Sequence, residues 1–211
     1  MKGLLVDYGG VLTTSVWESF SAFCQTEGLE ESTVKEVFRS DPRALELLRR
    51  LEVGELSEED FSEQFAPLLG INDHDGLIER LFAGMVPDER MIEALRRARK
   101  VGIRTGLVSN SWGRGRYDRD AFGELFDGVV ISGEVGLHKP QPEIFELGAE
   151  RIGVRAPECV FVDDLRENCA GAEAVGMTAV LHRDTDITLA RLEELLEVPF
   201  TDPEVRRTSS L

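Results

Sequence analysis

The sequence contains few of the residues that cross-link secreted proteins or bind transition metals, with 3 cysteines and 3 histidines among 211 residues. The cysteines are far apart and form no Cys-x-x-Cys pair, which favours a cytoplasmic protein with reduced thiols over one held together by disulfides. The histidines are scattered along the chain, so a histidine metal site is not expected.

Long hydrophobic runs are also missing, because no apolar stretch reaches the roughly 18 residues that a membrane-spanning helix needs. The first residues are apolar only as far as Asp7, and we interpret them as a buried strand rather than a signal peptide. The 24 basic side chains are outnumbered by 40 acidic ones, which leaves a formal charge of −16. Such an acidic protein repels phosphate backbones and anionic lipids, so neither a nucleic acid nor a membrane is expected as a partner.

What the sequence does contain is a regular alternation of short apolar runs and helical patterns. Such alternation is typical of βαβ units, in which helices cover both faces of a parallel sheet. We therefore expect an α/β fold with a doubly wound, parallel, Rossmann-like sheet of about five strands. The expected strands cover residues 2–7, 103–108, 128–131, 159–163 and 178–181, and a short helix is expected over 119–126.

Residues 14–84 have no strand pattern, and their apolar residues recur at helical spacing. Asp41-Pro42 and Ser57 mark two helix starts within this region. The sequence thus predicts an all-helical unit inserted just after the first strand, between the two parts of an α/β core. The expected division is 1–13 and 85–200 for the core, 14–84 for the insertion and 201–211 for a flexible tail.

Acidic residues stand at the ends of two expected strands, Asp7 after the first and Asp163-Asp164 after the fourth. Ligands bind such sheets beyond the carboxyl ends of the strands, and carboxylates gathered there repel one another unless a divalent cation lies between them. Oxygen ligands of this kind suit Mg²⁺. Ser109 ends another strand, and Lys139 adds a cation beside a proline. Together these groups indicate a phosphoryl-transfer site.

These segments, taken in order, resemble the motifs of the haloacid dehalogenase superfamily, in its phosphatase-like branch with a helical cap inserted after the first strand. Each motif alone is commonplace, but the ordered set and the position of the inserted helices are specific. The motifs are Asp-Tyr-Gly-Gly-Val-Leu at 7–12, Val-Ser-Asn at 108–110, Lys-Pro at 139–140, and Val-Asp-Asp at 162–164 with Asn168.

The resemblance implies that Asp7 attacks phosphorus and forms an aspartyl-phosphate, which water then hydrolyses. It implies a Mg²⁺ ion held by Asp7, the backbone carbonyl of Gly9 and Asp164. Asp163 and Asn168 would bind the waters around that metal.

It further implies that Ser109 and the backbone amide of Asn110 bind the phosphoryl oxygens, while Lys139 neutralises charge. The helical cap would close over the site and contact the organic part of a small phosphorylated metabolite. Trp17 fits either the core of the cap or the wall of this substrate pocket. The sequence does not distinguish a monomer from a homodimer.

One position departs from the family pattern. Phosphatases of the superfamily usually have a second aspartate two residues after the nucleophile, which protonates the leaving oxygen and later activates water; here that position is Gly9. Losing a general acid–base typically lowers the rate by about 10²–10⁴-fold. Either another group substitutes, or the enzyme favours good leaving groups, or turnover is weak.

Three alternatives remain open at this stage. A 2-haloacid dehalogenase would use Asp7 without a metal, but such enzymes have tyrosine at the Gly9 position, and Asp163-Asp164 favours a metal. Phosphonate cleavage needs a cap lysine, and Lys35 is the only lysine in the insertion. A catalytically weak member could instead serve as a ligand- or partner-binding module.

Overall fold

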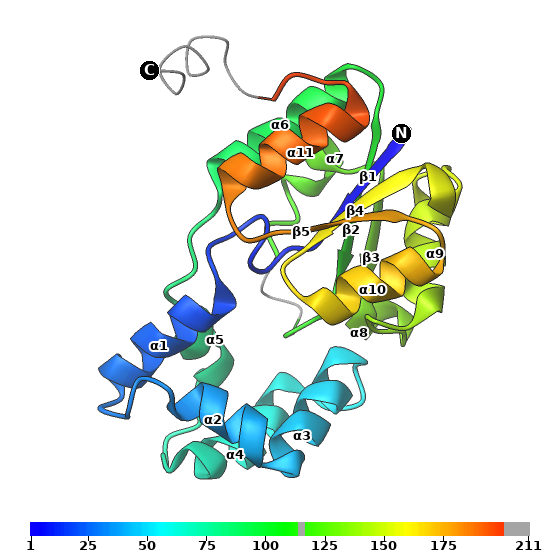
Figure 1. Ribbon diagram of the computed structural model, residues 1–211. Coiled ribbons are helices and arrows are strands. Elements are labelled where there is room, and N and C mark those ends of the chain that lie inside the picture. Colours follow the sequence, from blue (N-terminus) through cyan, green and yellow to red (C-terminus); the bar gives the residue numbers. More distant parts are fainter. Residues whose placement is uncertain (114–116, 201–211) are drawn as a thin grey trace, which may run out of the picture.

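The computed structural model describes residues 1–113 and 117–200, and a parallel β-sheet forms its centre (Figure 1). Five strands lie in the order β3-β2-β1-β4-β5, which confirms the expected α/β class and doubly wound sheet. The strands are β1 (Gly3–Val6), β2 (Arg104–Ser109), β3 (Gly128–Ile131), β4 (Cys159–Asp163) and β5 (Thr178–Leu181). The last three have the bounds that the sequence predicted.

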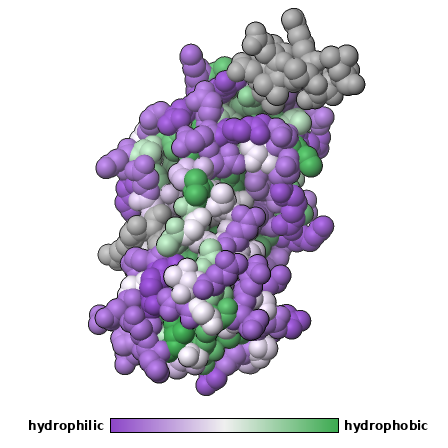
Figure 2. All heavy atoms as spheres, turned by 90° about the vertical axis from the view of Figure 1, so that its left-hand side faces the viewer, coloured by the Kyte–Doolittle hydropathy of each residue, from purple (hydrophilic) through white to green (hydrophobic). Residues whose placement is uncertain are grey.

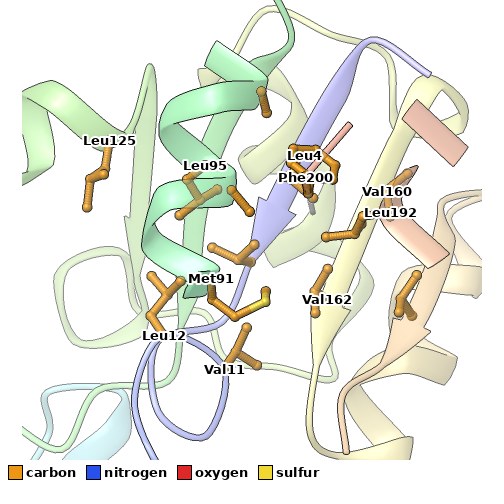
Figure 3. Packing of buried hydrophobic residues seen from close by; sticks show 14 of the residues in the cluster. Leu4, Val11, Leu12, Met91, Leu95, Leu125, Val160, Val162, Leu192 and Phe200 are labelled. Carbon is orange, nitrogen blue, oxygen red and sulfur yellow. The ribbon is translucent and has the colours of Figure 1, made fainter. Parts of the chain in front are cut away.

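Helices cover both faces of this sheet, as a parallel sheet requires. Side chains alternate across β1, so that Leu4 and Val6 lie in one hydrophobic cluster and Leu5 lies in another. On the first face Leu4, Met91 and Leu192 belong to the same cluster (Figure 3). The helices concerned are α6 (Glu89–Lys100) and α11 (Thr185–Leu196) on the first face, and α9 (Pro142–Arg151) and α10 (Arg166–Ala174) on the second.

The short helix expected over 119–126 begins later than predicted, since α7 covers only Phe122–Leu125. The carboxylate of Asp118 accepts a hydrogen bond from the N–H of Ala121, which holds the preceding residues in a turn. Two other short helices are α8 (Ser132–Val135) and the 3₁₀ helix η2 (Ala156–Glu158).

Residues 14–84 contain helices only, among the described elements, and these helices share a hydrophobic cluster of their own. Asp41 and Ser57 cap two of them, because each side chain accepts a hydrogen bond from the first turn, as the sequence predicted. Phe61, Phe65 and Leu77 are fully buried within the cluster. The helices are α1 (Val16–Thr26), α2 (Thr33–Ser40), α3 (Pro42–Glu52), α4 (Glu58–Leu69) and α5 (Leu77–Phe82).

The chain leaves the α/β core and returns to it at one place. Thr13 and Pro87 form an isolated antiparallel bridge, and the N–H of Asp88 donates to the carbonyl of Leu12 over 2.9 Å. The end of α3 contacts the core directly, because the hydroxyl of Ser132 donates to the main-chain carbonyl of Glu52. These contacts hold the helical insertion over the carboxyl ends of the strands.

The outer surface of the chain is largely polar. Hydrophilic side chains cover most of the face drawn in Figure 2, and hydrophobic ones gather only in small patches. None of the helices in the described part of the chain combines the length and the apolar composition that a membrane span requires. The tail expected at 201–211 lies outside the described residues.

Candidate active site

Three acidic side chains meet at the carboxyl edge of the sheet. Asp7 follows β1, and its N–H donates to the carbonyl of Val162 over 2.9 Å, which continues the strand pairing. Asp163 is the last residue of β4, and Asp164 comes next. Asp7, Asp163 and Asp164 each offer a carboxylate oxygen within 4.8 Å of the others. The structure therefore brings together carboxylates that the sequence separates by more than half its length.

Lys139 lies between two of these carboxylates, in the loop before α9. Its ammonium is 2.8 Å from Oδ1 of Asp7 and 2.7 Å from Oδ2 of Asp163, and its side chain is fully buried. Asn110 fixes the backbone of Lys139, since Oδ1 of Asn110 accepts from the N–H over 2.8 Å and Nδ2 donates to the carbonyl over 3.1 Å. The Asn110 side chain thus positions the lysine.

Asp163 is held from several sides, and this leaves it in one orientation. Nδ2 of Asn168 lies 3.0 and 3.1 Å from its two oxygens, and the N–H of Leu165 donates to Oδ1 over 2.8 Å. Asp164 instead lines the cavity and lies against Gly10. A Cβ atom at Gly10, where φ is +73°, would stand only 2.7 Å from Oδ2 of Asp164. The glycine is therefore required where the backbone passes this carboxylate.

The charges of the site do not balance. Burial raises the pKa of Asp7 to about 7, although the Lys139 ammonium opposes the shift. Burial, assisted by the charge of Asp163, raises the pKa of Asp164 to about 6. Burial alone would lower the pKa of Lys139, but its pairs with Asp163 and Asp7 outweigh burial and raise it. The lysine thus faces more carboxylate charge than it neutralises.

This donor set fits a Mg²⁺ ion. Mg²⁺ prefers oxygen ligands and is usually bound through one or two carboxylates, with water and substrate phosphate completing its shell. Asp7 and Asp164 provide carboxylates beside the cavity, and a divalent cation would offset the surplus negative charge. Asp163 is already bonded to Lys139 and Asn168, so it orients its neighbours rather than facing the cavity.

Ser109 ends β2 and is buried beside the lysine loop. Its Oγ accepts a hydrogen bond from the hydroxyl of Tyr117 over 3.1 Å. Tyr117 could not be predicted as a site residue from the sequence, because it stands in a loop without periodicity. Burial raises the pKa of Tyr117 to about 12, so its hydroxyl remains a proton-bearing donor near neutral pH. Its ring packs on Tyr8, with 4.9 Å between ring centroids.

A cavity of about 320 Å³ joins this site to the helical insertion, and Asp7, Gly9 and Lys139 line its inner end. Trp17 lines the cavity and is 41% exposed. Of the two positions that the sequence allowed for it, the core of the helical insertion and the wall of the pocket, it therefore occupies the second. Trp112, which follows β2 and packs against the helical insertion, is half-buried and lines the cavity as well.

Two charged residues of the insertion differ in their relation to the cavity. Glu52, the last residue of α3, lines it, and burial raises the pKa of its carboxyl group to about 8. The sequence does not show that Glu52 lines the cavity, because glutamates at the end of a helix are commonly exposed. Lys35 is exposed on α2 and does not belong to the residues that line the cavity. The phosphonate-cleaving alternative therefore gains no support.

Comparison with known proteins gives one family over most of the chain. A model of haloacid dehalogenase-like hydrolases matches residues 1–176. Bifunctional epoxide hydrolase 2 of Rattus norvegicus is 30% identical over 119 residues, which are 53% of this chain and 22% of that protein. The chain therefore spans about a fifth of the length of this relative.

Two further relatives are named for phosphatase activity. Sesquiterpene phosphatase astK of Aspergillus oryzae is 28% identical over 160 residues, covering 72% of this chain and 80% of that protein. Glyceraldehyde 3-phosphate phosphatase of Methanopyrus kandleri is 31% identical over 154 residues, covering 71% and 62%. A haloacid dehalogenase family enzyme of Bacteroides thetaiotaomicron, crystallised with magnesium and inorganic phosphate, has the same fold, with a TM-score of 0.63 and 22% identity over 87% of this chain and 94% of that one.

Proposed function

We propose that this chain, which belongs to the haloacid dehalogenase-like hydrolases, is a Mg²⁺-dependent phosphohydrolase that acts on a small phosphorylated metabolite. The observation that carries the proposal is the buried group formed by Asp7, Lys139 and Asp163, with Asp164 beside it. A carboxylate nucleophile, a fixed cation and a further pair of carboxylates are the parts that phosphoryl transfer requires.

In this proposal Asp7, the backbone carbonyl of Gly9 and Asp164 would hold the Mg²⁺ ion. When bound, the ion neutralises charge on the phosphoryl oxygens. Asp163 and Asn168, bonded to each other, keep the lysine in place. They would bind the waters around the ion from behind the two cavity-lining carboxylates. The magnesium in the Bacteroides thetaiotaomicron enzyme supports this assignment by analogy.

The residues of the chain then act in two steps. An oxygen of the Asp7 carboxylate attacks phosphorus, the bond between phosphorus and the ester oxygen breaks, and an aspartyl-phosphate forms. Water next attacks this phosphorus, which releases inorganic phosphate and restores Asp7. Lys139 neutralises developing charge throughout, while the Ser109 hydroxyl and the Asn110 amide bind phosphoryl oxygens. Residues 14–84 act as the cap, and Trp17 contacts the substrate.

Gly9 stands where family phosphatases have their acid–base aspartate, so without a proton donor elsewhere in the cavity the enzyme prefers good leaving groups. Acetyl phosphate and para-nitrophenyl phosphate should therefore be hydrolysed faster than simple alkyl phosphates. Equal rates for the two classes would contradict this preference.

A panel of phosphate esters and acyl phosphates, assayed with Mg²⁺ for the intact protein and for Asp7→Asn, tests the proposal. Hydrolysis that needs both Mg²⁺ and Asp7 supports it. Activity on 2-haloacids that persists in EDTA would indicate a dehalogenase instead. A ligand-binding module would show no turnover, and Asp7→Asn would keep its ligand.

A further inference from the structure

We infer that the organic group of the substrate is apolar, either aryl or alkyl, where it meets the helical insertion. The inference rests on the proposed phosphohydrolase function and names its substrate class. The two ends of the cavity differ sharply in chemistry. The strand-end side is charged, whereas the residues that line the cavity from positions 16–85 are all apolar or aromatic apart from Glu52, among them Phe20, Phe38 and Phe82.

These aromatic rings form a connected wall. The ring centroid of Trp112 lies 5.6 Å from that of Phe20, 5.8 Å from that of Phe38 and 5.1 Å from that of Phe82. Aromatic rings at such separations attract one another and fix their mutual orientation. The cavity thus has a preformed apolar wall of rings set at steep angles to one another, against which an aryl ring or an alkyl chain packs without leaving polar groups unpaired.

The mouth of the cavity carries apolar surface that nothing in the described chain covers. Leu45 is 54% exposed and Trp17 is 41% exposed, although both line the cavity. An apolar group joined to a phosphate bound at Asp7 would remove this surface from water.

A sugar phosphate fits this lining poorly. Its hydroxyl groups would leave water for a wall that offers Glu52 as its only charged side chain among residues 16–85. Each buried hydroxyl without a partner lowers affinity by about tenfold. The two phosphatase relatives do not decide the matter, because one is named for a sesquiterpene and the other for glyceraldehyde 3-phosphate, at 28% and 31% identity.

Para-substituted phenyl phosphates test the inference, because their leaving groups are nearly equal. The most direct pair is para-ethylphenyl and para-(hydroxymethyl)phenyl phosphate, which differ by a methyl for a hydroxyl. We expect kcat/KM to favour the ethyl compound by about tenfold and to rise by about fourfold with each added methylene until the cavity is full. Equal values, or a preference for the hydroxyl compound, would overturn the inference.

The control for the reaction is para-nitrophenyl phosphate with the intact protein and with Asp7→Asn. Hydrolysis that depends on Asp7 but shows no apolar preference refutes the substrate class alone. If no phosphate ester is hydrolysed, both the proposed function and the substrate class are refuted.

Substitution at the cavity mouth provides a second test. Leu45→Gln should reduce the ratio of kcat/KM for para-butylphenyl phosphate to that for phenyl phosphate by about tenfold, because the butyl group then meets an amide. Ile187→Gln is the matched control, since Ile187 is an exposed aliphatic residue in α11, 70% exposed and outside the cavity lining. An equal ratio in the two variants would overturn the inference that the apolar group meets the insertion at the cavity mouth.

A different observation concerns Glu52, and from it we propose that its carboxyl group supplies the proton that no side chain at Gly9 can supply. Glu52 lines the same cavity as Asp7 and Lys139, and its Oε2 lies 3.5 Å from Nδ2 of Asn110. Its main-chain carbonyl is bonded to Ser132, which fixes the end of α3 over the site.

The surroundings of Glu52 favour the protonated acid. It is the last residue of α3, where the partial negative charge of the helix end disfavours a carboxylate. Burial raises its pKa to about 8, with the charge of Asp7 adding to the shift and Lys139 opposing it. The carboxyl group therefore carries a proton when substrate binds near neutral pH.

The proton then moves in both steps. As the bond between phosphorus and the ester oxygen breaks, Glu52 transfers its proton to that oxygen, and the alcohol leaves neutral. As water attacks the aspartyl-phosphate, the Glu52 carboxylate accepts a proton from that water and returns to its acid form. No further reactant is required.

The leaving-group dependence of Glu52→Gln tests this role. We expect kcat/KM for para-methylphenyl phosphate to fall by about 10²–10⁴-fold, while that for para-nitrophenyl phosphate, whose leaving group needs no proton, falls less than tenfold. Glu52→Asp, which keeps the acid, should recover part of the loss. Glu55→Gln, an exposed neighbour outside the cavity lining, is the matched control. An equal fall for both substrates, or no fall, would overturn the proposal.

Discussion

Lys139→Met tests whether the buried ion pairs hold the site together. The ammonium stands 2.8 Å from Asp7 and 2.7 Å from Asp163, and the lysine side chain is 0% exposed. Methionine keeps most of the apolar stem but leaves the carboxylates without their cation. Breaking a buried pair in this way costs about 3–5 kcal/mol. For a chain of this length, that corresponds to a fall in Tm of about 6–20 °C.

The loss should grow with pH. The pKa of Asp7 is about 7 even with Lys139 beside it, and the lysine lowers that pKa, so Lys139→Met raises it further. Between the ordinary aspartate pKa and this raised value, the native state holds a proton that the unfolded state has released. Native stability therefore falls as pH rises through this range, and in the variant the fall continues to higher pH. The variant should be closest to the wild type near pH 5.5 and furthest from it near pH 8.5.

Urea and thermal unfolding in EDTA measure the effect. Lys2→Met is the matched control, because Lys2 forms an ion pair of similar length with Glu158, 2.6 Å, but is 72% exposed. Exposed pairs contribute little, so this control should unfold close to the wild type. Lys139→Met combined with Asp7→Asn should recover stability, since the neutral amide needs no cation. An unfolding midpoint for Lys139→Met equal to that of Lys2→Met would refute the reasoning.

Three further outcomes are expected. Mg²⁺ should raise Tm more at pH 8 than at pH 5.5, because its ligands must lose protons and the pKa values of Asp7 and Asp164 are about 7 and 6; equal shifts would contradict the metal site. Gly10→Ala should weaken Mg²⁺ binding and turnover, unlike Gly28→Ala, which has a similar positive φ but open space around it. Burial lowers the pKa of His182, so the unfolded state gains a proton first and stability should drop as pH falls below 6.5; His182→Gln should flatten that drop in urea unfolding.

The site residues at the strand ends could be predicted from the sequence, because the topology of a parallel sheet determines where the strand ends lie. A short apolar run that ends in a polar residue marks a buried parallel strand, and all such strands present their carboxyl ends at one edge. Asp7, Ser109 and Asp163 follow this rule, and the structure brings them together. Lys139 has no such positional signal, since a lysine before a proline is common, and only the acidic strand ends and the other motifs around it in the sequence indicate its role.

The residues of the insertion could not be assigned in this way. A helical pattern shows which residues are apolar, but not which of them face the helical core and which face a cavity. Trp112 and Phe20 do both, because they pack against the helices and also line the cavity. Glu52 was missed because its place depends on the bond between its carbonyl and Ser132, a contact between residues 80 positions apart.

The strand ends and the helical insertion differ in what they indicate about the substrate. The charged end of the cavity is built from strand ends, and in the proposed function these motif residues would bind the phosphate of any substrate. The organic group would meet the insertion, where substitutions such as Leu45→Gln would change selectivity while leaving Asp7 and Lys139 in place. Relatives named for a sesquiterpene and for glyceraldehyde 3-phosphate are 28% and 31% identical to this chain, so identity over the whole chain does not separate an apolar substrate from a polar one. On our inference the side chains that line the cavity from residues 16–85 would separate them, because a hydroxyl group buried there needs a partner that phenylalanine and leucine lack.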